Sequence, residues 1–328
     1  MKAAWYTHNG EAQDVMQVGE LPTPAPQAGE VLVRLATSGV NPSDVKSRRA
    51  RPLTDPLIVP HSDGAGVIEA VGAGVSAGRV GQRVWVWNGQ WQRAMGTCAQ
   101  YIALPDAQAV ALPDGTDFAA GACMGIPGLT AVQAVILAER LAGDLRGQTV
   151  WVSGASSAVG HYITQMVCLA GGRVIGTVGS EAKAAHAKAA GMQEAVFYKT
   201  ESVPERVKAL TQGRGADVII DMDFSTTARW AAEGALAPHG QVVCYGSNAL
   251  DVNLPFRPWL FQSMGVKFFL VYDLTPADRQ VAVARLSDML SQQQLQHSIG
   301  ARFTLDQIAL AHQTVEAGQT VGNVVVDL

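Results

Sequence analysis

The chain has 328 residues, more than one hydrophobic core usually holds, and this length predicts two domains. Hydrophobic residues make up 48% of it and charged residues 16%, a balance that excludes a disordered chain and indicates a globular protein. The formal net charge of −4 argues against a nucleic acid or an anionic membrane as partner.

The start of the chain and its apolar runs bear on localisation. Residues 1–6 lack the apolar core of a signal peptide, and no uninterrupted apolar stretch reaches the length of a membrane-spanning helix. We therefore expect a cytoplasmic protein without a membrane segment.

Two groups of residues that can signal function are interpreted as structural. The cysteines are scattered, without the close pairs that zinc and redox motifs use, so we expect small buried side chains at Cys98, Cys123, Cys168 and Cys244. The basic run at residues 46–51 is interpreted as a solvated loop surface.

The first third of the chain is rich in predicted strands. Runs of β-branched residues punctuated by glycine and proline predict strands at residues 31–40, 65–71, 83–87 and 101–104. Beyond Thr116 the pattern changes to Ala, Leu and Val at helical spacing, beginning with a helix at residues 128–141. This change of pattern indicates a domain boundary.

Between residues 148 and 246, strand and helix patterns alternate. The predicted strands are residues 149–153, 173–178, 195–198, 216–221 and 241–245. The predicted helices are residues 157–170, 181–190, 204–211 and 226–237. Such alternation makes a parallel sheet, so we expect a doubly wound α/β fold.

The end of the chain adds four predicted elements. They are a strand at residues 266–272, a helix that opens near Thr275, an amphipathic helix at residues 305–317 and a strand at residues 324–326.

The turn between the first predicted strand and helix of the alternating region is made of small residues. The strand ending at Val152 runs into Ser153-Gly154-Ala155-Ser156-Ser157-Ala158-Val159-Gly160. Backbone amides at such a helix N-terminus approach a diphosphate closely, and Gly160 permits close helix–strand contact. An ordinary tight turn is the alternative. A second small-residue turn, at residues 176–180, favours a dinucleotide site.

The end of the second strand bears on the choice of cofactor. NAD-selective sites usually carry a carboxylate there, whereas this strand ends in Gly179-Ser180. Ser180 and Lys183 suit a 2′-phosphate, which favours NADPH. Glu181 keeps NADH as an alternative, and Lys183 also fits an ordinary exposed helix lysine.

Several motifs together carry a resemblance. They are GVNP at residues 39–42 followed by Asp44, DGAGVIEAVG at 63–72, GQRV at 81–84, GIPGLTA at 125–131, the turn at 153–160 and GTVGS at 176–180. Over essentially its whole length the chain resembles the medium-chain dehydrogenase/reductases, and within them the zinc-free quinone oxidoreductase group that includes zeta-crystallin. The resemblance implies a GroES-like β-rich catalytic domain (residues 1–125), a Rossmann doubly wound parallel-sheet NADP-binding domain (126–264) and a C-terminal segment that returns to the catalytic domain (265–328).

The resemblance also implies site residues. Zinc-dependent members carry a cysteine and a histidine where this chain has Asn41 and Ser62, and their lobe of four cysteines is missing, so no metal is expected. His61 is interpreted as a hydrogen-bonded loop residue. The positions that correspond to cofactor-binding residues are Asn41, Thr130, Ser157, Ala158, Val159, Gly160, Gly179, Ser180, Lys183, Tyr198, Ser225, Tyr245, Gly246, Ser247, Asn248, Phe268, Phe269 and Leu270.

The chain departs from the pattern of this group at three of its positions. Members usually have two glycines where this chain has Ser157 and Ala158, and an aromatic residue where it has Lys46. Serine and alanine are still small enough for a phosphate turn, whereas Lys46 changes the size or the charge of the substrate pocket.

The activity implied is NADPH-dependent reduction of a quinone or an α,β-unsaturated carbonyl compound. Asn41 is the candidate for the positioning of the reactants, and Lys46 or water is the candidate proton source. The alternatives are a reductase of an enoyl or acryloyl thioester and a non-catalytic dinucleotide-binding protein of the crystallin or RNA-binding kind. A homodimer is expected, and residues 262–272 either pair with their copy or form a buried strand.

Overall fold

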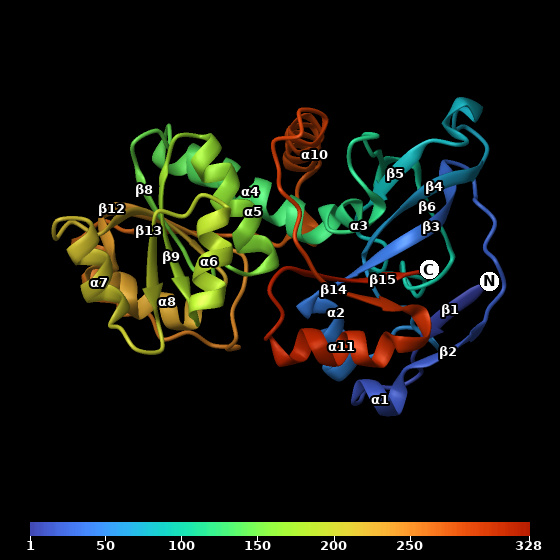
Figure 1. The fold of residues 1–328 in the computed structure, drawn as a ribbon, viewed down its shortest axis with the longest axis horizontal. Helices are drawn as coiled ribbons and strands as arrows, with labels where there is room; N and C mark the ends of the chain where they lie inside the picture. The colour runs from blue at the N-terminus through green and yellow to red at the C-terminus, as the bar shows by residue number, and fades with distance from the viewer. The chain divides into compact units, whose positions relative to one another are not determined.

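The computed structural model describes residues 1–328, and the chain in it divides into two units. The first unit combines Met1–Pro127 with Ser287–Leu328, and the second is formed by Gly128–Leu286. In Figure 1 the first unit therefore contains both the blue N-terminal elements and the red C-terminal ones.

The first unit is built on a mixed sheet. Its strands follow the order β14-β15-β3-β4-β5-β7, β6 also pairs with β3, and β1 and β2 form a separate pair. The bounds are β1 (Lys2–Trp5), β2 (Gln17–Glu20), β3 (Glu30–Val40), β4 (Asp63–Val71), β5 (Arg83–Val86), β6 (Tyr101–Pro105), β7 (Ala109–Ala111), β14 (Ile299–Thr304) and β15 (Asn323–Asp327). Alternate residues of β3, namely Val31, Val33 and Leu35, are buried in one hydrophobic cluster, as the period of a strand requires.

The helices of the first unit are short. They are α1 (Ala12–Val15), α2 (Pro42–Ala50), α3 (Phe118–Gly121) and α11 (Ile308–Ala317), with the turns η1 (Ala77–Arg79), η2 (Asp106–Gln108), η3 (Met124–Gly128) and η6 (Leu305–Gln307). None of the helices in the protein combines the length and the apolar character that crossing a membrane requires.

The second unit is a parallel sheet of six strands with helices on both faces (Figure 1). The strand order is β10-β9-β8-β11-β12-β13, with bounds β8 (Thr149–Val152), β9 (Arg173–Val178), β10 (Glu194–Phe197), β11 (Ala216–Asp221), β12 (Leu236–Cys244) and β13 (Gly265–Phe268). Its helices are α4 (Leu129–Ala142), α5 (Ala158–Leu169), α6 (Glu181–Ala189), α7 (Val203–Leu210), α8 (Phe224–Trp230), α9 (Phe256–Phe261) and most of α10 (Pro276–Ser291), with the turns η4 (Ala231–Ala235) and η5 (Val271–Asp273). The expected doubly wound fold is confirmed.

The strand order places the switch point of this sheet. The chain runs outward from β8 to β9 and β10, then returns so that β11 lies beside β8. In open α/β sheets ligands bind at the carboxyl ends of the strands where the order reverses. Those ends are the turn after Val152 and the residues after Ile220.

The boundary expected at residues 264 and 265 differs from the one in the structure. The segment from Gly265 to Leu286 belongs to the second unit, because β13 pairs in parallel with β12. Only the chain from Ser287 onward returns to the first unit. The first boundary lies between Pro127 and Gly128, two residues beyond the expected position.

Three predictions are wrong in part. The strand expected at residues 266–272 ends at Phe268, and Val271–Asp273 form the turn η5. The helix expected to reach residue 237 ends earlier, because Gly234 has a φ of 99° and β12 starts at Leu236. The basic run at residues 46–51 was expected to be a solvated loop, yet most of it forms the end of α2. The Arg48 side chain is fully buried there and pairs with Glu316.

Candidate functional site

The turn after β8 is tied to the strands on both of its sides. The amide of Gly154 donates to Thr177 Oγ1 over 3.0 Å and that of Ala155 to the Thr177 carbonyl over 3.2 Å. On the other side, Ser153 Oγ donates to Asp221 Oδ1 over 2.7 Å. The turn is therefore held in place at the switch point of the sheet.

Glycine is required at two positions of this turn. Gly154 has a φ of 64°, in the left-handed region that other residues rarely adopt. A Cβ on Gly160 would lie 2.2 Å from the Gly154 carbonyl oxygen, so only glycine lets the helix approach the strand this closely. This is the role that the sequence predicted for Gly160.

The first turn of α5 presents donors to a ligand. Ser157 is the N-cap, and its Oγ accepts from the Gly160 amide over 3.0 Å. Ser157, Ala158 and Val159 are partly exposed, and amides at this end of a helix have no intrahelical acceptor. A helix N-terminus binds anions, so these residues can bind the diphosphate of a dinucleotide.

The end of β9 holds the residues proposed to read the 2′-phosphate. Ser180 is the N-cap of α6, and its Oγ accepts from the amide of Lys183. A Cβ on Gly179 would lie 3.0 Å from Tyr198 Oη, so the half-exposed Tyr198 side chain lies directly over this turn. The structure thus brings Gly179, Ser180, Lys183 and Tyr198 together.

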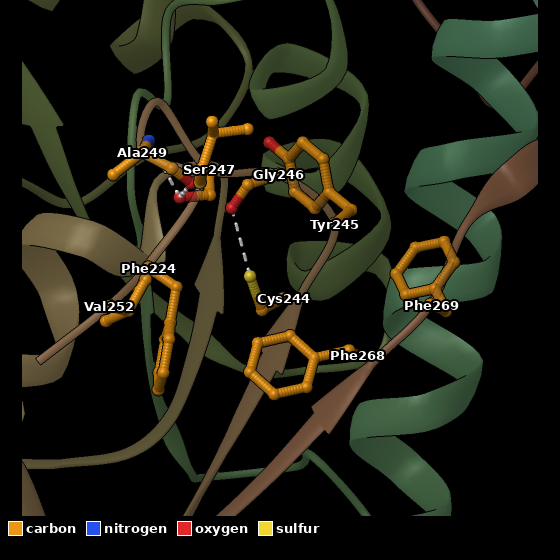
Figure 2. Close-up of a pocket in the computed structure, with 10 residues that line it drawn as sticks. Phe224, Cys244, Tyr245, Gly246, Ser247, Ala249, Val252, Phe268 and Phe269 are labelled. Carbon is orange, nitrogen blue, oxygen red and sulfur yellow. Dashed lines mark hydrogen bonds between the residues drawn. The ribbon is translucent and has the colours of Figure 1, made fainter. Parts of the chain in front are cut away.

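A pocket of about 440 Å³ lies at the ends of β12 and β13 (Figure 2). Aromatic side chains form much of its wall, and its lining residues are Phe224, Cys244, Tyr245, Gly246, Ser247, Ala249, Leu250, Val252, Phe268 and Phe269. Cys244 Sγ donates to the Gly246 carbonyl over 3.1 Å, and burial raises the pKa of this thiol to about 12. Five predicted residues line this pocket, which has the size of a small-molecule site.

Two carboxyl groups that the sequence reasoning missed organise this end of the sheet. Asp221 is fully buried, and its Oδ1 accepts from Ser153 Oγ and from Thr227 Oγ1 at 2.7 and 2.8 Å. Burial raises the pKa of Asp221. Asp223 Oδ1 accepts from the Asn248 amide at 3.1 Å and also from Ser225 Oγ. A signal was present, because Asp221 is the charged end of the apolar run Val218-Ile219-Ile220.

The remaining predicted residues of the second unit are placed differently. Thr130 is buried in the first turn of α4. Leu270 follows β13 with 49% of its surface exposed. Ser225 Oγ donates to the Asp223 carboxylate, so this hydroxyl group is engaged within the protein.

Asn41 lies in the first unit, between two buried carboxyl groups. Its Nδ2 donates to Asp63 Oδ2 over 2.8 Å, and its backbone amide donates to Asp44 Oδ2 over 2.7 Å. Burial raises the pKa of Asp44 to about 7 and raises that of Asp63 well above its usual range. The Asn41 amide group is therefore fixed in one orientation, which agrees with a positioning role.

His61 is a hydrogen-bonded loop residue, as predicted. Its Nδ1 lies 2.9 Å from Ser38 Oγ, and its Nε2 lies 3.0 Å from His312 Nε2. Both rings are buried, and burial lowers both pKa values. The two nitrogens of His61 are thus both engaged with protein groups. Cys98, Cys123 and Cys244 are buried as predicted, whereas Cys168 is partly exposed, and all four thiols are free.

Family models match both units. The alcohol dehydrogenase GroES-like domain matches residues 27–114, and the zinc-binding dehydrogenase model matches residues 158–288. The first lies within the first unit and the second almost wholly within the second unit.

Known relatives align along most of the chain. A quinone oxidoreductase from Pongo abelii is 29% identical over 302 residues, which cover 91% of this chain and 89% of the relative. A quinone oxidoreductase from Pseudomonas aeruginosa is 30% identical over 269 residues, 80% of each chain. A 2-haloacrylate reductase from Burkholderia sp is 27% identical over 318 residues, 93% of each chain.

Solved structures match the whole chain. A mycobacterial protein in complex with NADPH superimposes with a TM-score of 0.87 at 28% identity, and an NAD-dependent alcohol dehydrogenase with a TM-score of 0.88 at 27% identity. Each match covers 100% of both chains. With two matching family models and a relative at 30% identity, the chain belongs to the quinone oxidoreductase family of the medium-chain dehydrogenase/reductases and is an oxidoreductase.

Proposed function

We propose that this oxidoreductase uses NADPH to reduce a quinone or an α,β-unsaturated carbonyl compound, without a metal ion. NADPH supplies the hydride when bound. The protein supplies a fixed turn for the diphosphate, a pocket lined by aromatic side chains, and the oriented amide of Asn41. Quinone oxidoreductases among the relatives support the choice of acceptor.

The end of β9 is the observation that carries the choice of NADPH. Ser180, Lys183 and Tyr198 lie at the turn that follows β9. An NAD-selective site usually has a carboxylate at this turn. Lysine and a hydroxyl group are suitable partners for a 2′-phosphate. The structural neighbour bound to NADPH supports the same choice, whereas the NAD-dependent neighbour makes NADH the alternative.

Charge reversal on α6 tests this proposal. Lys183→Glu places a carboxylate beside the proposed 2′-phosphate, and we expect the preference for NADPH over NADH in kcat/KM to fall about 10-fold to 100-fold. Lys188→Glu is the matched control, because Lys188 is exposed in the last turn of the same helix. It changes the net charge equally and should leave the preference unchanged.

The choice of cofactor, the place of its 2′-phosphate and the class of acceptor are tested by different results. A wild-type preference for NADH contradicts the choice of cofactor. If the wild-type protein prefers NADPH and Lys183→Glu behaves as Lys188→Glu does, the 2′-phosphate lies elsewhere. A panel of quinones and enones, assayed with the preferred cofactor, tests the acceptor class.

A second candidate reaction is reduction of an activated acrylate or an enoyl thioester. The 2-haloacrylate reductase among the relatives favours it, and so does Lys46, an exposed cation on α2. An anionic acceptor gains from a nearby lysine, whereas an uncharged quinone does not. Steady-state rates with acrylates and acryloyl thioesters, beside quinones, distinguish the two candidates.

We further propose that the protein is a homodimer in which β13 pairs with its copy. β13 is an edge strand of the parallel sheet, and the unpaired backbone groups of an edge strand can pair with a second chain. Large apolar side chains are exposed on and beside it, at Phe256, Leu260, Phe261, Phe268 and Leu270.

A further inference from the structure

Ser157 and Tyr245 place two hydroxyl groups side by side at the start of α5. Ser157 is the N-cap of this helix, and Tyr245 follows the end of β12. The Tyr245 amide donates to the Asp221 carbonyl over 3.0 Å, which fixes the backbone of Tyr245 at the switch point. Its hydroxyl lies close to the Ser157 side chain.

The Ser157 hydroxyl has a proton to give. Its oxygen accepts from the Gly160 amide over 3.0 Å, so a lone pair is occupied and the O–H bond points elsewhere. Ser157 is partly exposed, as are Ala158 and Val159 in the same turn. A ligand at this helix end therefore meets the Ser157 hydroxyl together with the first amides of α5.

The Tyr245 hydroxyl is buried and has no hydrogen bond of ordinary geometry. Such orphaned polar atoms are rare in native proteins, because an unmet hydrogen bond in the interior costs free energy. Burial and the nearby Asp221 carboxyl raise the pKa of Tyr245, so its phenol keeps its proton and acts as a donor. In Figure 2 the hydroxyl points away from Phe268 and Phe269.

We propose that the hydroxyl groups of Ser157 and Tyr245 donate to the diphosphate bridge of the dinucleotide. This inference rests on the proposed function, which places a dinucleotide at the turn. The site then combines amides from α5 with two neutral donors from different strand ends. A dianionic diphosphate supplies the acceptors that the orphaned phenol lacks.

Tyr245→Phe is the cleanest test, because it removes only the hydroxyl group. We expect the dissociation constant for NADPH, measured by calorimetry, to rise about fivefold to tenfold, the loss expected for one hydrogen bond to a charged group. ADP-ribose, which keeps the diphosphate, should weaken by the same factor. The affinity for adenosine 2′-monophosphate, which lacks both phosphates of the bridge, should change less than twofold.

Ser157 needs a pair of variants. Ser157→Ala also uncaps α5, whereas Ser157→Thr keeps a hydroxyl group and a capping oxygen. We expect Ser157→Ala to weaken NADPH about fivefold and Ser157→Thr to restore most of that affinity. Tyr162→Phe is the control for Tyr245→Phe, because it removes the hydroxyl of a buried tyrosine farther along α5. It should leave the affinity for NADPH unchanged.

Two results overturn the inference in distinguishable ways. If the wild-type protein binds NADPH and both Tyr245→Phe and Ser157→Ala bind it within twofold of wild type, the hydroxyl groups do not contact the diphosphate. If the wild-type protein binds neither NADPH nor NADH, the proposed function fails and this assignment fails with it.

Discussion

The side-chain amide of Asn41 donates from Nδ2 to Asp63 Oδ2 over 2.8 Å, inside the first unit. Asn41 is also the N-cap of α2, and Asp44 of that helix accepts from its backbone amide. One residue thus links the start of β4 to the start of α2. The link explains how an asparagine on a loop can hold a defined orientation.

We predict that Asn41→Ala lowers kcat/KM for the acceptor about 10-fold, because the loss of one positioning hydrogen bond costs roughly 1 to 2 kcal/mol. Asp63→Asn should lower it less, because an amide oxygen still accepts from Asn41 Nδ2. Steady-state kinetics measure both effects. Equal activity of Asn41→Ala and wild type would rule out a positioning role for the side chain.

The histidine pair predicts a pH-dependent stability. Burial lowers the pKa of His312 to about 3 in the folded protein, below the usual value near 6.5. Its contribution to stability is therefore complete above about pH 6.5 and is lost as the pH falls toward 3, because the unfolded state takes up the proton first. His61 contributes in the same direction.

The free energy of unfolding should fall between pH 7.5 and pH 5 in both proteins. We expect the fall to be about 2 kcal/mol smaller in His312→Gln than in wild type, because one titrating group is removed. Denaturant midpoints at the two pH values measure this loss. His8→Gln, at an exposed histidine, is the control and should lose as much as wild type. An identical loss in His312→Gln would show that the buried pair does not set the acid sensitivity.

The ion pair of Arg48 and Glu316 predicts an asymmetric double-mutant cycle. Arg48 is fully buried, whereas 17% of the Glu316 side chain is exposed and Arg49 lies 3.8 Å from it. Glu316→Gln leaves the buried guanidinium of Arg48 without its carboxylate partner and should lower the free energy of unfolding by about 3 kcal/mol or more. Arg48→Met leaves the Glu316 carboxylate in contact with water and near Arg49, so it should lower the free energy of unfolding by less. The double variant should be more stable than Glu316→Gln alone.

Chemical denaturation measures this cycle. Arg229→Met is the control, since Arg229 is exposed and its pairing with Glu233 lies on the surface, where ion pairs contribute little. Equal costs for Arg48→Met and Glu316→Gln would contradict the asymmetry.

The exposed edge of the parallel sheet predicts the oligomeric state. Phe261→Asp with Phe268→Asp adds one charge at the end of α9 and one at the end of β13, and should convert a dimer of twice 34.5 kDa into a monomer. Light scattering after size-exclusion chromatography measures the mass. Leu310→Asp on α11 is the control, because Leu310 is a similarly exposed apolar residue of the first unit. A monomeric wild-type protein would overturn the proposed dimer.

The sequence by itself determined the features that depend on local periodicity and on small residues. Alternating strand and helix patterns at residues 148–246 predicted the parallel sheet, because each element must bury a face with its own period. The turn at residues 153–160 was recognisable because only small residues fit a close approach of helix and strand. Its glycines take that role in the structure.

Only the tertiary structure decided the features that depend on contacts between distant residues. In the sequence, Arg48 belongs to a basic run that is typical of a protein surface. In the structure it is buried, because it pairs with Glu316, 268 positions away. The segment after Gly265 joins the second unit because β12 offers it an open edge. The same holds for Asn41 with Asp63 and for Ser157 with Tyr245. The chemistry of these pairs comes from burial beside a particular partner, which no local pattern encodes.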